Sequence, residues 1–526
     1  MSGPAGSDGT GRDAEAARAA LELARAGRLA DAERGLREAL AAGPRGPLAL
    51  AELANVVAAR GRREEALALF DEALALDASV ARTHHNRAVT LAELRRHDAA
   101  ISGFDAALRL APGFARAHAA RADALRAQGW PREALAGYDR ALALEPGYAP
   151  AHNGRGIALR LLARPVSALA SFERALDARP GYVDAHANRA HTLIALGRLD
   201  DARDAYARAI AIDPAHAESR FGTGLVHLLR GELERGLELY EWRWRRPANP
   251  APRHAQVAPW RGDAPLAGRH LLLHAEQGLG DTIQFCRYAP IAARAGARVT
   301  LEVQRPLAGL LRGLDGVDAV FAMGDPIPRP DLECPMGSLP FAFRTTLADV
   351  PPPAPGLRAD PSLVERWSRA LGPRTRRRVG LAWSGARGHA NDANRSLPYA
   401  SLRRLLDADA DFVCVQDRVR DEDAPALAAD ARVRVFDGAL TDFAQTAALL
   451  ACVDLVVAVD TSVAHLAASL GRPTWILLPS APDWRWMLGR DDSPWYPTAR
   501  LFRQSTRGQW DDVVARIRTA LGAEPP

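Results

Sequence analysis

Polar side chains recur in the second half of this 526-residue chain, each directly after a short apolar run that predicts a β-strand. Ligands of open parallel sheets bind beyond the carboxyl ends of the strands. We therefore expect these side chains, together with those of two neighbouring loops, to converge on one ligand site. The residues concerned are Asp281, Ser384, Arg395, Gln416, the run Asp460–His465, and Trp484–Trp486.

The chemistry that these positions favour is the binding of an anion at the start of a helix. The strand His270–His274 is followed by a glycine-containing turn, residues 276–281, and then by a helix expected from Thr282. Glycines let the backbone approach a ligand closely, and the first amides of a helix are free to donate hydrogen bonds. Asp281, Thr461 and Ser462 also suit a purely structural role as helix N-caps. The residues alone leave both interpretations open.

The elements that must hold these residues are alternating strands and helices. Short apolar runs closed by glycine-rich or polar turns indicate βα units and a parallel sheet. A proline-rich stretch at Val350–Pro355 interrupts the pattern. We therefore predict two α/β lobes, at residues 268–360 and 376–526. The strands are expected at His270–His274, Arg298–Val303, Ala319–Ala322, Val379–Trp383, Phe412–Gln416, Leu455–Val459 and Thr474–Leu478.

A different pattern, with a period of 34 residues, fills the first 240 positions. Small residues recur in three ladders, one of which includes Ala54, Ala88 and Ala122. Such ladders mark helix pairs that touch at small residues, and they resemble the tetratricopeptide repeat. We predict an α-solenoid of about seven repeats over residues 13–245, a disordered tail at 1–12, and a linker or cap at 246–267. In one unit we expect helices at Arg82–Leu94 and Asp98–Leu110.

Polar residues also repeat with this period on the first helix of several units. They could form a polar ladder that holds an extended peptide backbone, or they could be ordinary repeat positions duplicated with the rest. A metal site between the histidines is disfavoured, because successive histidines would lie on different helices, roughly 10 Å apart in a stacked array. The positions are His84, Asn86, His118, His152, His186 and Asn188.

Composition narrows the possible functions further. All 68 basic residues are arginine, which excludes chemistry that needs a lysine, such as a Schiff base or a P-loop. The net charge of +5 is small, so we expect no nucleic-acid partner. The cysteines are few and far apart, favouring a reducing compartment. With neither a signal peptide nor an apolar stretch long enough to span a membrane, we expect a cytoplasmic protein.

Three segments carry a resemblance to a known family. The run VDTSVAHLAASLGRPTWILLP, Val459–Pro479, is similar to the donor-binding segment of glycosyltransferase family 9, the heptosyltransferases. GLGDTIQF and GLAWSG…NDANRSLP occur in the order found in that family, and the resemblance extends from Gly268 to the C-terminus. It implies a GT-B fold of two Rossmann-like lobes and an inverting, metal-independent transfer from a nucleotide sugar. The nucleotide sugar is then a substrate, and no cofactor is expected.

The resemblance also implies roles for individual residues. Asp281 would be the general base that accepts the proton of the acceptor hydroxyl. The helix that starts at Ser462, with Arg395 as the cation, would stabilise the leaving diphosphate. The family typically has a lysine where this chain has arginine. Thr461, Ser462 and His465 would lie alongside the diphosphate, Gln416 at the nucleobase or ribose, and Trp383 and Trp486 beside the sugar. Ser384 and Asp460 complete the expected donor-binding residues.

A typical heptosyltransferase has no repeats, so the repeats of this chain point to a different acceptor. The combination of repeats and transferase domain resembles bacterial repeat-fused glycosyltransferases, so heptose and lipopolysaccharide do not carry over as substrates. We predict a glycosyltransferase whose repeats recruit a protein or a protein-linked glycan as the acceptor. The alternative is a repeat scaffold whose transferase domain binds nucleotide sugars without turnover.

Overall fold

The computed structural model describes residues 7–43, 45–247, 249, 252–388, 391–436 and 438–523. The chain divides into two compact units. The first, here called the array unit, comprises residues 1–196 and 200–214, and the second, the sheet unit, comprises residues 197–199 and 215–526.

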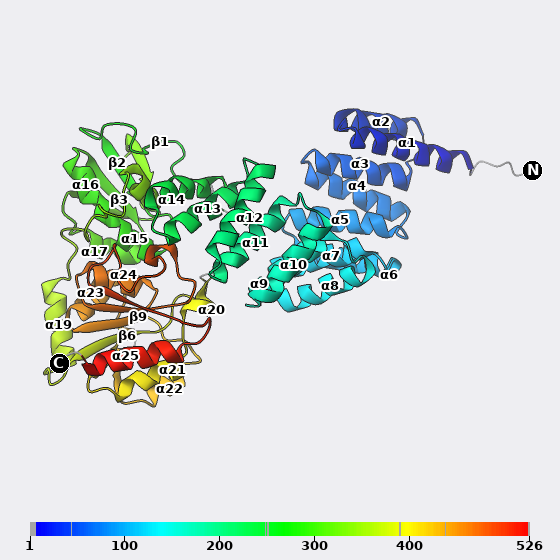
Figure 1. Cartoon of the computed structure of the whole chain (residues 1–526). Coiled ribbons are helices and arrows are strands. Elements are labelled where there is room, and N and C mark those ends of the chain that lie inside the picture. The colour runs from blue at the N-terminus through cyan, green and yellow to red at the C-terminus, as the bar shows by residue number, and fades with distance from the viewer. Residues whose placement is uncertain are drawn as a thin grey trace, which may run out of the picture. The chain divides into compact units, whose positions relative to one another are not determined.

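The array unit consists of paired antiparallel helices that follow one another from α1 to α12 (Figure 1). The ladder residues Ala54, Ala88 and Ala122 are completely buried. Gly156 shows why the ladder needs small residues, since a Cβ there would lie 2.5 Å from Cε1 of Phe172. The helices are α1 Ser7–Arg25, α2 Leu29–Ala42, α3 Pro47–Ala59, α4 Arg63–Leu76, α5 Ala81–Glu93, α6 His97–Leu110, α7 Ala115–Ala127, α8 Pro131–Leu144, α9 Ala149–Leu161, α10 Pro165–Ala178, α11 Val183–Ala195 and α12 Leu199–Ile212.

The N-terminal boundary differs from the prediction. Helix α1 already begins at Ser7, so residues 7–12 are helical rather than part of a disordered tail, while residues 1–6 lie outside the described residues. Asp13, where we expected the array to start, accepts hydrogen bonds from the amides of Leu48 and Ala49 at the start of α3. The α1 backbone is thereby anchored to the second repeat, an interaction that composition alone does not reveal.

The last helix pair belongs to the sheet unit. It consists of α13, Ala217–Leu229, and α14, Leu233–Tyr240, and continues into the 3₁₀ turn η1, Glu241–Arg245. The carbonyl of Leu229 accepts a hydrogen bond from the amide of Leu488 at 3.0 Å, and the ring of Tyr240 packs on Trp484 at 5.8 Å. The seventh repeat is therefore built into the α/β domain.

The N-terminal sheet has five parallel strands in the order β1-β5-β2-β3-β4. Strands β2 and β3 have the predicted bounds, whereas β1 lies inside the segment predicted as a linker, residues 246–267. Its two residues pair with β5, and Trp260 beside them is buried. The elements are β1 Ala258–Pro259, β2 His270–His274, α15 Leu279–Phe285, η2 Cys286–Tyr288, α16 Ala289–Arg294, β3 Arg298–Val303, α17 Arg305–Leu311, β4 Val317–Ala322, β5 Leu332–Pro335, η3 Met336–Ser338 and α18 Leu339–Ala342.

The C-terminal sheet has six parallel strands in the order β11-β10-β9-β6-β7-β8. Its buried core includes Val379, Leu381 and Trp383 from alternate positions of one chain segment. The elements are α19 Pro361–Leu371, β6 Arg378–Ala382, α20 Asp392–Arg395, α21 Tyr399–Leu402, η4 Arg403–Asp407, β7 Asp411–Cys414, α22 Ala424–Ala428, β8 Val433–Arg434, α23 Phe443–Ala451, β9 Leu455–Val459, α24 Ser462–Ser469, β10 Thr474–Leu478, η5 Trp484–Trp486, β11 Ala499–Arg503 and α25 Asp511–Ala523.

Along the chain, a helical solenoid is followed by two α/β lobes, each built on a sheet of parallel strands, which is the predicted fold class. The four cysteines are all free. Within the described ranges, no helix combines the length and the apolar character that crossing a bilayer requires.

Candidate active site

Helices α15 and α24, one from each sheet, begin next to each other. Each follows the carboxyl end of a central strand, β2 for α15 and β9 for α24. A Cβ at Gly280 would lie 2.7 Å from Cδ2 of His465, so glycine is what allows the two helices to approach. The two polar turns predicted to bind ligand are thus neighbours in space.

Asp281 stands at the third position of α15 and uses both carboxylate oxygens. Its Oδ2 accepts a hydrogen bond from the Gly278 amide at 2.7 Å, completing a capping arrangement. Its Oδ1 forms an ion pair with Arg485. The side chain remains 23% exposed, so it is open to solvent. The structural capping role that the sequence left open is therefore present, and the side chain is still partly accessible.

Arg485 reaches Asp281 from the 3₁₀ turn η5 of the other sheet. Its guanidinium also donates to Asp483 at 2.8 Å and to Oε1 of Gln277 at 3.3 Å, and lies over the Trp484 ring at 4.6 Å. Burial favours the neutral form, but Asp281 and Asp483 outweigh it and raise the pKa of Arg485 well above its usual value. The cation is therefore permanent, and it ties the two sheets together beside Asp281.

The start of α24 offers unsatisfied hydrogen-bond donors. Thr461 is the N-cap residue, but its side chain makes no cap hydrogen bond, and its buried Oγ1 has no partner among the described residues. The next residue, Ser462, is half-buried. Because the first amides of a helix have no partner within the helix, this end carries partial positive charge, and the Thr461 side chain does not cap it.

Arg395 places a full positive charge beside that helix start. Its Nη1 donates to the backbone carbonyl of Asp460 at 2.9 Å, one residue before Thr461. A Cβ at Gly385 would lie 2.6 Å from Nη2 of Arg395, so this glycine makes room for the guanidinium. The buried Nε has no partner among the described residues. Arg395 and Thr461 thus both retain hydrogen-bonding capacity at one place.

His465 and Asp460 are held inside the protein near the same helix. Nδ1 of His465 bonds the hydroxyl of Tyr496 at 2.8 Å, and its Nε2 lies 3.7 Å from Oδ1 of Asp460. Burial works against ionisation of Asp460, but His465 and Arg395 lower its pKa. His465 is only 5% exposed, so the structure gives it a positioning role behind the helix start.

The two tryptophans predicted to wall the sugar are core residues, so that prediction is wrong for this structure. Trp383 is fully buried and donates its indole N–H to Asp423 at 2.9 Å. Trp486 is fully buried against His465, with ring centroids 5.1 Å apart. Trp383 continues the inward-facing alternation of its strand, and η5 turns Trp486 inward.

Gln416 and Ser384, two other predicted donor residues, bond mainly to each other and to nearby backbone. The Gln416 Oε1 accepts from the Trp383 amide at 3.0 Å, while its Nε2 donates to the Arg418 carbonyl at 2.9 Å and faces the Ser384 hydroxyl at 3.3 Å. Gln416 therefore joins the ends of β6 and β7. Its side chain has little capacity left for the nucleobase contact that we predicted.

Arg420 is a positioning residue that sequence reasoning missed. Its Nη2 contacts both carboxylate oxygens of Asp392, at 2.8 and 2.6 Å, and the hydroxyl of Ser396 at 3.0 Å. These bonds fix the loop on which Arg395 stands. In a chain whose basic residues are all arginine, no local signal distinguishes Arg420 from a solvated surface residue.

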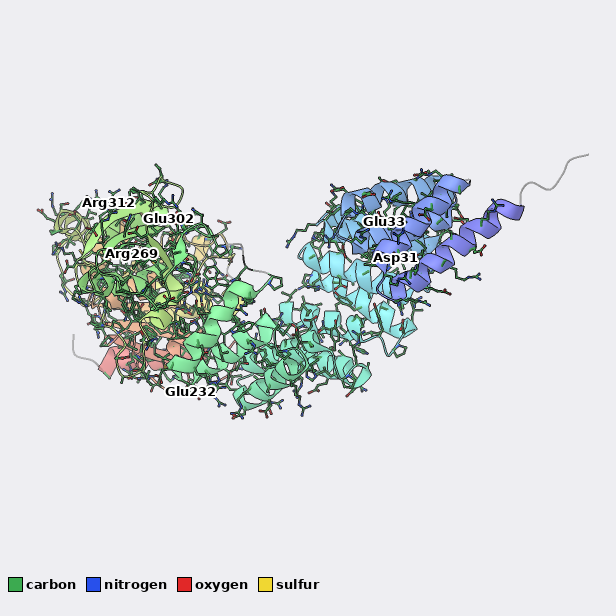
Figure 2. All side chains as sticks on the ribbon, turned by 90° about the horizontal axis from the view of Figure 1, so that it is seen from above. Asp31, Glu33, Glu232, Arg269, Glu302 and Arg312 are labelled. Atoms are coloured by element: carbon green, nitrogen blue, oxygen red, sulfur yellow. The ribbon has the colours of Figure 1, made fainter. Side chains whose placement is uncertain are left out.

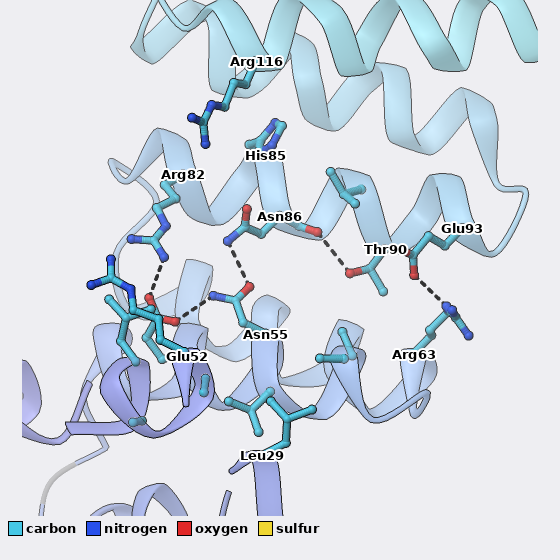
Figure 3. A pocket seen from close by; sticks show the side chains of 18 of the residues that line it. Leu29, Glu52, Asn55, Arg63, Arg82, His85, Asn86, Thr90, Glu93 and Arg116 are labelled. Carbon is cyan, nitrogen blue, oxygen red and sulfur yellow. Dashed lines mark hydrogen bonds and ion pairs between the residues drawn. The ribbon is translucent and has the colours of Figure 1, made fainter. Parts of the chain in front are cut away.

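The array unit carries a groove of roughly 940 Å³, formed by its first helix pairs (Figure 3). Asn86 lies in it and donates to Oδ1 of Asn55 at 2.9 Å, while Arg82 pairs with Glu52 at 3.0 Å. His85 also lines the groove, and burial together with Arg116 and Arg82 lowers its pKa to about 4. Both polar and apolar side chains line this groove.

The predicted histidine ladder has a structural role. Each histidine bonds, through Nε2, the backbone carbonyl six residues earlier, at distances of 2.8 to 3.0 Å. The ladder thereby fastens each first helix to the turn before it, which favours the interpretation as ordinary repeat positions, while peptide binding at these histidines stays a prediction. The histidines are His84, His118, His152 and His186. Asn188 instead bonds Asn153 at 3.1 Å, as Asn86 bonds Asn55.

Comparison with known families agrees with this architecture. The tetratricopeptide repeat matches at residues 12–81, 120–183 and 159–221. Glycosyltransferase family 9 (heptosyltransferase) matches at residues 418–503, which include α24 and Arg485. The chain joins tetratricopeptide repeats to a glycosyltransferase family 9 domain. The family 9 domain supplies the α24 helix start, and thus the unsatisfied donors described above.

Individual relatives match parts of the chain. Protein FlbA of Caulobacter vibrioides is 28% identical over 329 residues, which are 57% of this chain and 54% of FlbA. The chain thus spans about half the length of this curated relative. Among solved structures, a tetratricopeptide repeat protein from Parabacteroides merdae is 20% identical, with a TM-score of 0.38, covering 44% of this chain and 91% of that one. Pseudomonas aeruginosa pilF is 19% identical, with a TM-score of 0.36, covering 40% and 96%.

Proposed function

We propose that this protein transfers a sugar from a nucleotide-sugar donor to a protein or protein-linked glycan held by its repeats. The transfer is inverting and needs no metal. The family 9 match supports glycosyltransferase activity in general. The observation that carries the specific proposal is the uncapped start of α24, where Thr461 Oγ1 and Arg395 Nε lack partners beside a helix terminus.

The donor diphosphate binds at that helix start. A departing nucleoside diphosphate gains negative charge, and fixed amides and cations stabilise such charge without rearranging. The free amides at Ser462, the Thr461 hydroxyl and the Arg395 guanidinium supply this stabilisation. His465 and Asp460 lie behind the helix start and hold it in position.

Asp281 then acts as the general base. It accepts the proton of the acceptor hydroxyl while the oxygen of that hydroxyl attacks the anomeric carbon from the side opposite the diphosphate. Arg485 pairs with the same carboxylate from the other sheet. The Gly278 amide holds the carboxylate in one orientation.

The acceptor is recruited by the groove of the array unit. Asn55 and Asn86 present amide groups there, and backbone amides and carbonyls of an extended peptide pair with such groups regardless of sequence. In the alternative function, an inactive scaffold, the same groove would bind partners while the sheet unit only bound donor.

The test is a thermal-shift screen of the full chain against a panel of nucleotide sugars, with and without EDTA. A ligand that binds only the folded state raises Tm by mass action. We expect one donor class to raise Tm, and the increment over the ligand-free sample to be the same in EDTA. Release of nucleoside diphosphate from that donor then measures turnover.

Two variants and one control make the screen specific. Arg395→Gln and Thr461→Val should abolish most of the donor-induced shift. Arg387→Gln should retain it, because Arg387 lies in the same loop but pairs with Glu422 at the surface. A panel without any stabilising donor would refute the donor site. A stabilising donor with no turnover under any acceptor condition would favour the scaffold.

A further inference from the structure

A compact cluster of histidine and glutamate side chains lies in the N-terminal sheet, apart from the α24 helix start. One ligand atom from each of His254, His274 and Glu302 lies within 4.8 Å of the others. His274 and Glu302 are register partners on the adjacent strands β2 and β3, so they share one face of the sheet. Figure 2 labels Glu302 among the green elements of this sheet. The side chains of His274 and Glu302 are 2% and 7% exposed.

The hydrogen bonds within the cluster prepare a free imidazole nitrogen. Nε2 of His274 bonds Oε2 of Glu333 at 2.6 Å, and its buried Nδ1 has no partner among the described residues. Metal-binding histidines characteristically donate their other ring N–H to a carboxylate, which fixes the tautomer and makes the binding nitrogen more basic. Glu333 therefore stands in the place of such an orienting carboxylate.

The ligand atoms of the cluster also suit a cation. Glu302 and Glu333 are buried acidic side chains, and Arg253 lies 2.9 Å from Glu302. Nε2 of His254 lies 2.9 Å from Oε2 of the same glutamate. Two imidazole nitrogens with a carboxylate oxygen form a ligand set typical of zinc.

We propose that His254, His274 and Glu302 bind one divalent transition-metal ion of the zinc class, with Glu333 orienting His274. Tetrahedral zinc with bonds near 2.0 Å has ligand atoms about 3.3 Å apart, so the observed spacing requires only small side-chain rotations. The ion would fasten the segment of His254, which follows the last repeat, to the centre of the sheet. Its ligands belong to none of the elements that form the donor site, so the inference stands apart from the proposed metal-independent transfer.

The test uses the full-length chain with any affinity tag removed, stripped with a chelator and then dialysed. Cobalt(II) is titrated while visible absorption is recorded, because tetrahedral cobalt gives intense ligand-field bands. Zinc affinity follows from competition against a chromophoric chelator. We expect one equivalent of cobalt to produce the tetrahedral spectrum, and zinc to displace it.

Variants separate this cluster from adventitious binding. His254→Gln and Glu302→Gln should each weaken zinc binding more than about 100-fold, and Glu333→Gln about 10- to 100-fold. His227→Gln should bind normally, because His227 pairs with Glu232 outside the cluster. Arg253→Met should tighten binding, since it removes a cation that competes for Glu302.

The outcomes decide the proposal even if one variant folds poorly. His254 is the most exposed ligand, with 15% of its side chain accessible, so its variant is the best tolerated. Folded His254→Gln with unchanged affinity would overturn the site, as would a wild-type chain that takes up no cobalt. Donor binding is measured as a Tm increment in EDTA, so failure of the metal proposal would not refute the proposed function. Metal binding is measured by absorption without donor, so failure of the proposed function would not refute the metal site.

Discussion

Arg485 and Asp281 form an ion pair that joins η5 of the C-terminal sheet to the first turn of α15 in the N-terminal sheet. The same guanidinium contacts Gln277, whose Nε2 donates to the hydroxyl of Tyr240 at 2.7 Å. Tyr240 ends the last repeat helix, so a continuous set of hydrogen bonds runs from the seventh repeat to the proposed base. The geometry of Asp281 therefore depends on residues from three parts of the sheet unit.

Replacing Asp281 with Asn should remove the base and spare the fold. The amide oxygen can still accept from the Gly278 amide, so α15 keeps its cap. General-base catalysis is worth roughly 10²- to 10⁴-fold, and we expect turnover to fall within that range. Donor-induced Tm shifts should persist. Asp483→Asn is the matched control, because it removes the other carboxylate partner of Arg485. Equal activity of Asp281→Asn and the wild type would exclude Asp281 as the base.

Replacing Arg485 with Met should destabilise the sheet unit. Arg485 is 6% exposed, and its loss leaves Asp281 and Gln277 without their cationic partner. Removing one member of a buried pair costs about 3–5 kcal/mol, and the partial exposure of Asp281 places this case at the lower end. Urea unfolding measures the change. The double variant, Arg485→Met with Asp281→Asn, should recover part of the lost stability. If its change in the free energy of unfolding equals the sum of the two single changes, the ion pair contributes nothing.

Replacing Arg395 with Gln should weaken donor binding without large loss of stability. A hydrogen bond to a charged group contributes about 1.5–3 kcal/mol, so the dissociation constant for the donor should rise roughly 10- to 150-fold. Isothermal titration calorimetry with the stabilising donor measures it. The effect should shrink for the corresponding nucleoside, which lacks phosphates. A similar loss for nucleoside and nucleotide sugar would place Arg395 away from the diphosphate.

Much of the fold follows from local sequence patterns. The bounds of β2, β3, β9 and β10 match the predicted strands because each is an apolar run ended by a turn. β1, β5, β8 and β11 escaped prediction; β1 and β8 have only two residues each, and β5 has four. Their pairing is fixed by distant chain segments, which a local pattern cannot convey.

The site was less predictable than the fold, for physical reasons that differ by residue. The period-two alternation Val379, Leu381, Trp383 already places Trp383 on the core face, a signal that we overlooked. The bond of His118 to the Pro112 carbonyl joins a helix to the preceding turn, and nothing in the spacing of the repeats indicates it. Arg485 could not be singled out either, because its importance lies in a partner 204 positions away.

The histidine ladder should contribute to stability and not to ligand binding. In His152→Ala, the carbonyl of Pro146 loses its partner at 2.8 Å, and a typical hydrogen bond contributes about 0.5–1.5 kcal/mol. We expect a decrease of that size in the free energy of unfolding, measured with urea. His152→Gln should restore part of it, because its amide can donate to the same carbonyl. An unchanged stability in His152→Ala would show that the ladder bonds are dispensable.

Acid should destabilise the array unit through Glu33, which Figure 2 labels on the blue helices. Arg62, Arg37 and Arg60 bond this carboxylate and, against the opposing effect of burial, lower its pKa from 4.5 to about 2. Between these values the unfolded chain binds more protons than the folded chain, so the stabilisation is complete above pH 4.5 and disappears as pH falls towards 2. The midpoint of thermal unfolding followed by circular dichroism should therefore drop across this window. Glu33→Gln should be less stable than the wild type at neutral pH, and its unfolding midpoint should depend less on pH below pH 4.5. If the midpoints of the two proteins instead fall in parallel with pH, Glu33 is not the source of the acid sensitivity.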